Sequence, residues 1–117
     1  MNNRNALPKI VRQAFSILDS FVSNEDKNYF LQQSKADFVC DQHFGLGLWI
    51  RNNWIYGTDD KSCLRMLAGL GKGELCLEHP DSVSSRFLAK YYDHLKRVDN
   101  SLHHTNRTVY GKRAQTL

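Results

Sequence analysis

The spacing of apolar side chains predicts helices in the first third of the chain. From Leu7 to Val22 the apolar positions recur every three or four residues, as on one face of a helix, and Pro8 suits the first turn. Ser23 is a capping residue followed by two acids, which favours a short second helix ending at about Gln33. We expect these two helices to pack as a hairpin.

A third helix is predicted from Ser34, which can cap it, into the stretch HFGLGLWIRNNWIY, residues 43–56. The apolar spacing there favours continuation to about Asn53. Each interior glycine costs about 1 kcal/mol relative to alanine. Gly45 and Gly47 are therefore expected to let another element come close.

The second half of the chain predicts a short helix and a long one. After a turn over residues 54–60, a helix is expected from Lys61 to about Leu70, and glycines break it. Asp81 or Ser82 can then cap a long helix, whose apolar face would consist of Val83, Phe87, Leu88, Tyr91, Leu95 and Val98. From Asp99 onward the sequence is polar, basic and poorly periodic.

These elements predict a mainly α fold. At 117 residues the chain fits one domain, and it has no internal repeat and no sustained alternation typical of strands. We expect a compact single domain of about five helices over residues 1–100, followed by a basic, flexible C-terminal tail over residues 101–117.

The positive charge is concentrated near the ends of the chain. The net charge is +4, but Arg107, Lys112 and Arg113 lie in the tail without an acid, so residues 1–100 hold 13 cations against 12 acids. Arg4, Lys9 and Arg12 form a second basic cluster. The body itself is nearly neutral, which weakens a nucleic-acid interpretation based on total charge.

Cysteine usage and hydropathy favour a cytoplasmic protein. Cys40, Cys63 and Cys76 are odd in number and widely spaced, so they indicate neither a disulfide framework nor a paired zinc site, and burial is expected for them. No apolar run approaches the roughly 20 residues that cross a bilayer. The first residues also lack the pattern of a signal peptide.

No sequence motif indicates catalysis or a cofactor. Gly45-x-Gly47 and Gly71-Lys72-Gly73 lack the spacing of nucleotide-binding loops, and no pair of histidines or cysteines has metal-ligand spacing. Cys40 and His43, three residues apart, form the one nameable nucleophile and base pair, although helix packing explains them better. We therefore expect no enzyme activity, no metal and no cofactor.

Arg51 is the most informative single charge because it lies within the aromatic stretch. It can stack on a tryptophan and bind a carboxylate of a ligand. The favoured alternative is an internal salt bridge to Asp37, Asp59 or Asp81.

The string His43-Phe44-Gly45-Leu46-Gly47-Leu48-Trp49-Ile50-Arg51-Asn52-Asn53-Trp54, with the later His79-Pro80-Asp81 and its aromatic-rich helix, resembles a small bacterial family without known activity. The resemblance spans about Asp37 to Lys96. It implies a fold module and no reaction. Two tryptophans, a phenylalanine and two glycines on one helix suggest a crowded crossing with the last helix, so core is the first interpretation.

The function expected from this sequence is binding of a cognate protein. A small cytoplasmic α-domain without a catalytic set fits an immunity protein or antitoxin that neutralises a toxin, for example a nuclease. Exposed aromatic and arginine side chains make interface hot spots. The predicted contact residues are Arg51, Trp54, Tyr56, Tyr92, Arg107, Lys112 and Arg113. The near-neutral body requires a toxin with a mixed or acidic contact surface.

The alternative function is a small nucleic-acid-binding module. In that case Arg4, Lys9, Arg12 and the basic tail would contact phosphates, and binding would weaken steeply with salt. An interface with a membrane is not expected.

Overall fold

The computed structural model describes residues 7–56, 61–71 and 73–110, and for residues 101–110 it describes the backbone only. Over these ranges the chain is helical and contains no strand, which confirms the predicted mainly α fold. The elements in chain order are α1 (Val11–Phe21), α2 (Asn24–Gln32), α3 (Lys35–Asp41), α4 (Leu46–Ile50), the π-helical segment η2 (Arg51–Ile55), α5 (Ser62–Leu67) and α6 (Pro80–Tyr110).

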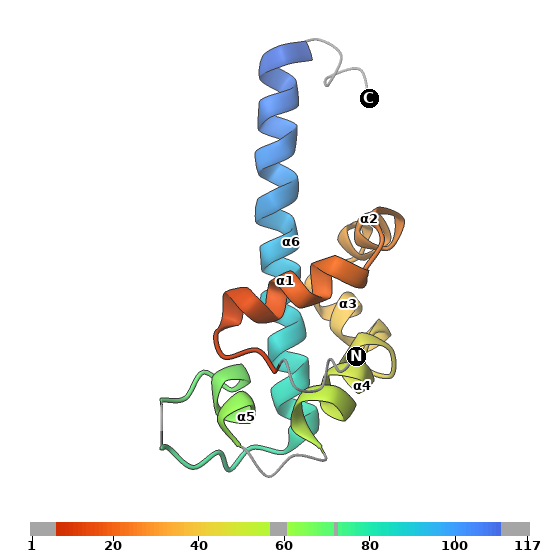
Figure 1. The fold of residues 1–117 in the computed structure, drawn as a ribbon. Helices are drawn as coiled ribbons and strands as arrows, with labels where there is room; N and C mark the ends of the chain where they lie inside the picture. The colour runs from red at the N-terminus through yellow and green to blue at the C-terminus, as the bar shows by residue number, and fades with distance from the viewer. Residues whose placement is uncertain (1–6, 57–60, 72, 111–117) are drawn as a thin grey trace.

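Helix α6 is the axis of the fold, and the other helices surround its first half (Figure 1). Helices α2 to α5 and η2 all contact it, and α1 crosses it through Phe15, whose ring centroid lies 5.5 Å from that of Phe87. The buried side chains of α6 recur at helical spacing and are Val83, Ser84, Phe87, Leu88, Tyr91, Tyr92 and Leu95. One helix therefore supplies a core face to every other element.

The first helix begins four residues later than predicted. Ile10 is extended (φ −136°, ψ 160°) and α1 starts at Val11, so Pro8 precedes the helix instead of opening it. Leu7 and Pro8 line a hollow beside α5, and this packing keeps the segment extended. Tertiary contact thus outweighs the helical pattern at this end.

The predicted caps of α2 and α3 are confirmed, but the prediction that the first two helices pack as a hairpin is wrong. Ser23 and Ser34 each accept a backbone N–H, from Asp26 at 3.0 Å and from Asp37 at 3.1 Å. Helix α2 packs on α3 and α6 rather than back along α1. The Tyr92 hydroxyl fixes this arrangement because it donates to the carbonyl of Gln33 at 2.7 Å.

The helix predicted to run from Ser34 to about Asn53 is broken between α3 and α4. The side-chain oxygen of Gln42 accepts the N–H of Leu46, four residues later in the chain, at 3.2 Å. A Cβ atom on Gly45 would lie 2.7 Å from that side-chain oxygen, so glycine makes room for the turn. The helix then continues past Asn53 to Ile55.

A π-helical turn carries the end of the aromatic stretch into the core. The N–H of Tyr56 bonds to the carbonyl of Arg51 at 2.7 Å, five residues back. Ile50, Trp54 and Ile55 are buried, and the Trp54 ring meets Phe87 edge-on at 6.2 Å. The interpretation as core against the last helix is confirmed for these residues, but it is wrong for Phe44, which is 78% exposed.

Helix α6 differs from its prediction at both ends. Its first turn is capped by His79, whose Nδ1 accepts the N–H of Asp81 at 3.0 Å, and not by Asp81 or Ser82. Its backbone continues past Asp99, where the periodic pattern ends, to Tyr110. The outer half projects beyond the other helices (Figure 1). Residues 111–117 of the predicted tail lie outside the described residues.

Replacement of Trp54 by alanine tests the core assignment. Because Trp54 is only 3% exposed, Trp54→Ala is expected to lower the free energy of unfolding by about 3–5 kcal/mol. The neighbouring Tyr56 is 44% exposed, so Tyr56→Ala is the control and should cost about 0.5 kcal/mol or less. Chemical denaturation measures both, and equal losses would contradict the assignment.

Candidate protein-binding groove

Three of the side chains predicted to contact a partner are buried. Arg51, Trp54 and Tyr92 have exposed fractions of 3%, 3% and 6%, so their expected exposure is wrong. The reason is that helical periodicity leaves the direction of an aromatic side chain open until its neighbours are known. Tyr56 is exposed as expected. The side chain of Arg107 and residues 112 and 113 lie outside the described residues.

Arg51 makes the internal salt bridge that was the favoured alternative. Its Nε lies 3.2 Å from Oδ1 of Asp81, its Nη1 donates to the Ser84 hydroxyl at 2.8 Å, and its Nη2 donates to the His43 carbonyl at 3.0 Å. The guanidinium is thus used on three sides. Asp37 is not its partner, and Asp59 lies outside the described residues.

The candidate chemical pair, Cys40 and His43, is not assembled as a nucleophile and base. Helix α3 ends at Asp41, and the His43 ring packs edge-on against Phe44, with its Nε2 4.0 Å from Asp81. Within the described ranges no group of three or more histidine, cysteine or acidic side chains is arranged to hold a metal. The predicted burial of the cysteines is confirmed for Cys63 but is wrong for Cys40, which is exposed.

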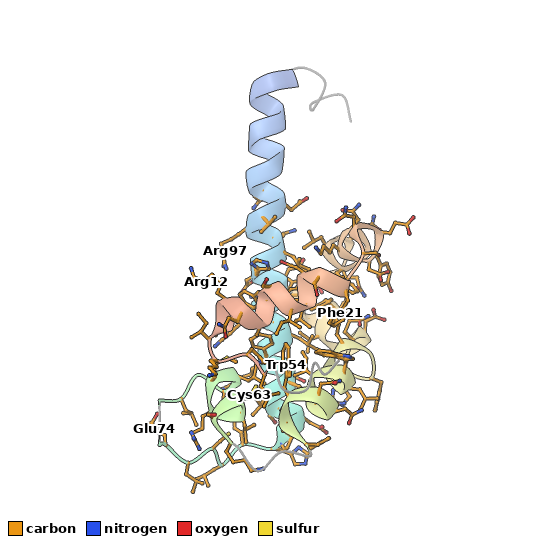
Figure 2. The ribbon with its side chains drawn as sticks, in the orientation of Figure 1. Arg12, Phe21, Trp54, Cys63, Glu74 and Arg97 are labelled. Atoms are coloured by element: carbon orange, nitrogen blue, oxygen red, sulfur yellow. The ribbon has the colours of Figure 1, made fainter. Side chains whose placement is uncertain are left out.

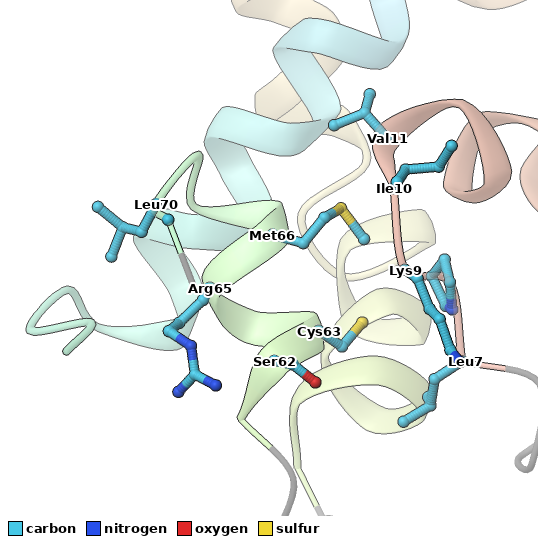
Figure 3. A pocket seen from close by; sticks show the side chains of 11 residues that line it. Leu7, Lys9, Ile10, Val11, Ser62, Cys63, Arg65, Met66 and Leu70 are labelled. Carbon is cyan, nitrogen blue, oxygen red and sulfur yellow. The ribbon is translucent and has the colours of Figure 1, made fainter. Parts of the chain in front are cut away.

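A groove of about 740 Å³ lies between the extended segment before α1 and helix α5. On one side Leu7, Ile10 and the stem of Lys9 form its wall, and on the other Cys63 and Met66 point toward them (Figure 3). The full lining is Leu7, Pro8, Lys9, Ile10, Val11, Ser62, Cys63, Arg65, Met66, Leu70 and Gly71. This lining is mostly apolar, and its size falls within the range of ligand-binding clefts.

Positive charge lines the groove, and exposed leucines follow it along the chain. Lys9 and Arg65 are its charged lining residues, and neither forms an ion pair with a described residue. The chain leaves the groove at Gly71 and continues to Leu75 and Leu77, which are 78% and 86% exposed. The sequence does not indicate this site, because its residues are far apart along the chain and follow no helical or strand periodicity.

A second polar cluster ties α1 to α6. Oδ1 of Asp19 accepts the Tyr91 hydroxyl at 2.7 Å and lies 3.6 Å from Nζ of Lys27, while Oδ2 lies 2.9 Å from Nε2 of His94. Burial raises the pKa of Asp19, but the hydrogen bonds from His94 and Tyr91 and the charge of Lys27 outweigh it, so the net pKa is lowered. Burial, and then the bond to Asp19, raise the pKa of Tyr91 far above its ordinary value. Asp19 is therefore a carboxylate that is hydrogen-bonded to Tyr91 and His94 and ion-paired with Lys27.

Comparison with known proteins places the body of the chain in one family. The model of a domain of unknown function, DUF6794, matches residues 7–95. The chain belongs to this family. The match ends at Leu95, which is the last buried side chain of α6 among residues 80–100, where the structure describes side chains. The outer half of that helix lies outside the DUF6794 region. No curated protein and no solved structure matches the chain. None of the described helices has the length and apolar character needed to cross a membrane.

The lowered pKa of Asp19 predicts a pH dependence of stability for this DUF6794 domain. In the unfolded chain Asp19 returns to its ordinary pKa of 3.8, so its contribution is complete above that value and is lost as the pH falls through the lower folded pKa. Asp19→Asn is expected to be less stable than the wild type at neutral pH, and the difference should narrow below about pH 4. Urea unfolding at several pH values measures this, and a difference that is independent of pH would contradict it.

Proposed function

We propose that this protein is a non-catalytic binding module that captures a partner protein in the groove between residues 7–11 and α5. The observation that carries the proposal is the groove itself, which is about 740 Å³ in volume, mostly apolar in its lining and open to solvent. Apolar grooves of this kind accept the apolar face of a helix or an extended segment of another protein.

The charges around the groove define the chemistry of the partner. Lys9 and Arg65 lack acidic partners among the described residues, so an apolar segment flanked by Asp or Glu would complement them. The Arg65 Nε atom is buried without a hydrogen-bond acceptor, and an acidic side chain would supply one. We infer a partner segment that is amphipathic and acidic.

The specific form of the function that we propose is an immunity protein or antitoxin acting in the cytoplasm. Such a protein needs a contact surface and no reaction centre. An acidic or mixed toxin surface fits the basic margin of the groove. The groove does not specify the toxin's own activity, nuclease or other.

Nucleic-acid binding is the second candidate because Lys9 and Arg12 are exposed and unpaired within the described residues. Arg4 and the tail cations that would complete this surface lie outside those residues. Affinity for nucleic acid would fall steeply with salt, whereas an apolar protein contact would persist.

Substitution in the groove tests the proposed function. Ile10 lines the groove and is 46% exposed, so Ile10→Asp should disrupt partner binding without unfolding the domain. A partner captured by the wild-type protein at high salt is expected to bind this variant at least about tenfold more weakly by calorimetry. If the partner is a toxin, the wild-type chain should restore growth to cells that express it, and Ile10→Asp should not.

Val98→Asp is the matched control, because Val98 is 45% exposed, is also β-branched and lies on α6 outside the groove. This variant should bind as the wild type does. Equal losses in both variants, or none in Ile10→Asp, would contradict the groove as the contact surface. A partner that neither harms growth nor is inhibited would contradict the immunity role alone.

A further inference from the structure

A second hollow, of about 510 Å³, lies between α1 and α6. Its lining comes from these two helices alone and comprises Val11, Arg12, Phe15, Ser16, Asp19, His94 and Arg97. Figure 2 shows the side chains of Arg12 and Arg97 reaching toward the same space beside α1. Two arginines from separate helices thus share one hollow.

The acid in this hollow does not neutralise the two arginines. Both oxygens of Asp19 are already engaged, with Tyr91 and Lys27 on one and His94 on the other. Neither Arg12 nor Arg97 forms an ion pair with any described residue. The hollow therefore carries an excess of positive charge.

Several other cations among the described residues have acidic partners. Lys27, Lys35, Arg51 and Arg86 each lie within ion-pair distance of an acid. The one acid that lines the hollow, Asp19, is engaged by Tyr91, His94 and Lys27. The two guanidinium groups therefore repel each other, and an anion between them would reverse the sign of that interaction. The arrangement is thus unfavourable for the free protein and favourable for an anion complex.

We propose that this hollow binds the phosphate group of a small organic phosphomonoester. Two guanidinium groups suit a dianion with three acceptor oxygens, since each can donate a pair of N–H groups to it. The Ser16 hydroxyl lines the same space as a further donor, and Val11 and Phe15 offer apolar surface to the organic part. The site is separate from the protein-binding groove, with which it shares only Val11.

Titration with phenyl phosphate at constant ionic strength tests the proposal, with inorganic phosphate and benzoate as comparison ligands. Both phosphates are expected to bind the full-length wild-type protein and to raise its melting temperature, phenyl phosphate more tightly, and benzoate at least about tenfold more weakly. Arg12→Gln and Arg97→Gln should each weaken phenyl phosphate binding at least about tenfold.

Lys90→Gln is the matched control, because Lys90 lies on α6 outside the hollow and the change removes the same charge. It should leave binding unchanged. In the absence of ligand, Arg12→Gln and Arg97→Gln should melt at or above the wild-type temperature, since each relieves the repulsion. That result separates loss of a ligand contact from loss of fold.

Three results would overturn the proposal. The first is phenyl phosphate binding that survives both arginine substitutions. The second is a loss of affinity in Lys90→Gln as large as that in the arginine variants. The third is a short single-stranded oligonucleotide that binds through the same arginines more tightly than phenyl phosphate does. The last result would assign the hollow to a nucleic-acid backbone. None of them bears on the partner groove, which is tested by Ile10→Asp.

Discussion

The structure depends on one buried guanidinium. Arg51 lies where α4 passes into η2, and it reaches the carbonyl of His43 on one side and Asp81 and Ser84 at the start of α6 on the other. A buried charge costs several kcal/mol unless it is paired and hydrogen-bonded. This requirement fixes the α3–α4 turn against the beginning of the central helix.

The rest of the core is arranged around that contact. Gly47 allows the close approach, because a Cβ atom there would lie 3.2 Å from Nη1 of Arg51 and 3.3 Å from Cδ1 of Leu88. The π-helical turn then brings Trp54 onto Phe87. Farther along α6, Tyr91 and Tyr92 bind Asp19 of α1 and the end of α2 through their hydroxyls. Polar contacts at both ends of its buried face thus hold the central helix in register.

The sequence predicted the features of this fold that are local. Ser23 and Ser34 act as caps through hydrogen bonds within three residues, so their pattern was sufficient. The break at Gln42, the extended start before Val11 and the capping role of His79 depend on tertiary contacts or on unusual side-chain geometry, and no periodicity signals them. The salt bridge of Arg51 to Asp81 was predicted as one of three options, because a buried arginine requires an acid but does not specify which one.

Both candidate sites were harder to predict for a related reason. The groove joins Ile10 to Met66, and the anion hollow joins Arg12 to Arg97, pairs that meet only after the chain has folded around α6. The aromatic stretch that attracts attention in the sequence is instead structural. Arg51, Trp54 and Ile55 are buried in the core, whereas Phe44 and Tyr56 of the same stretch are exposed. Both candidate sites therefore lie outside the stretch that is most conspicuous in the sequence.

The free energy of unfolding of Arg51→Lys tests whether this buried guanidinium organises the fold. Lysine keeps the charge but cannot reach three partners at once, so we predict a loss of about 2–4 kcal/mol in chemical denaturation. Arg86 is an exposed arginine that pairs with Glu78 and donates to the Ala68 carbonyl, and a lysine at this position keeps the charge. Arg86→Lys should therefore lose about 1 kcal/mol or less. A loss for Arg51→Lys no larger than that of Arg86→Lys would contradict the claim that this guanidinium organises the fold.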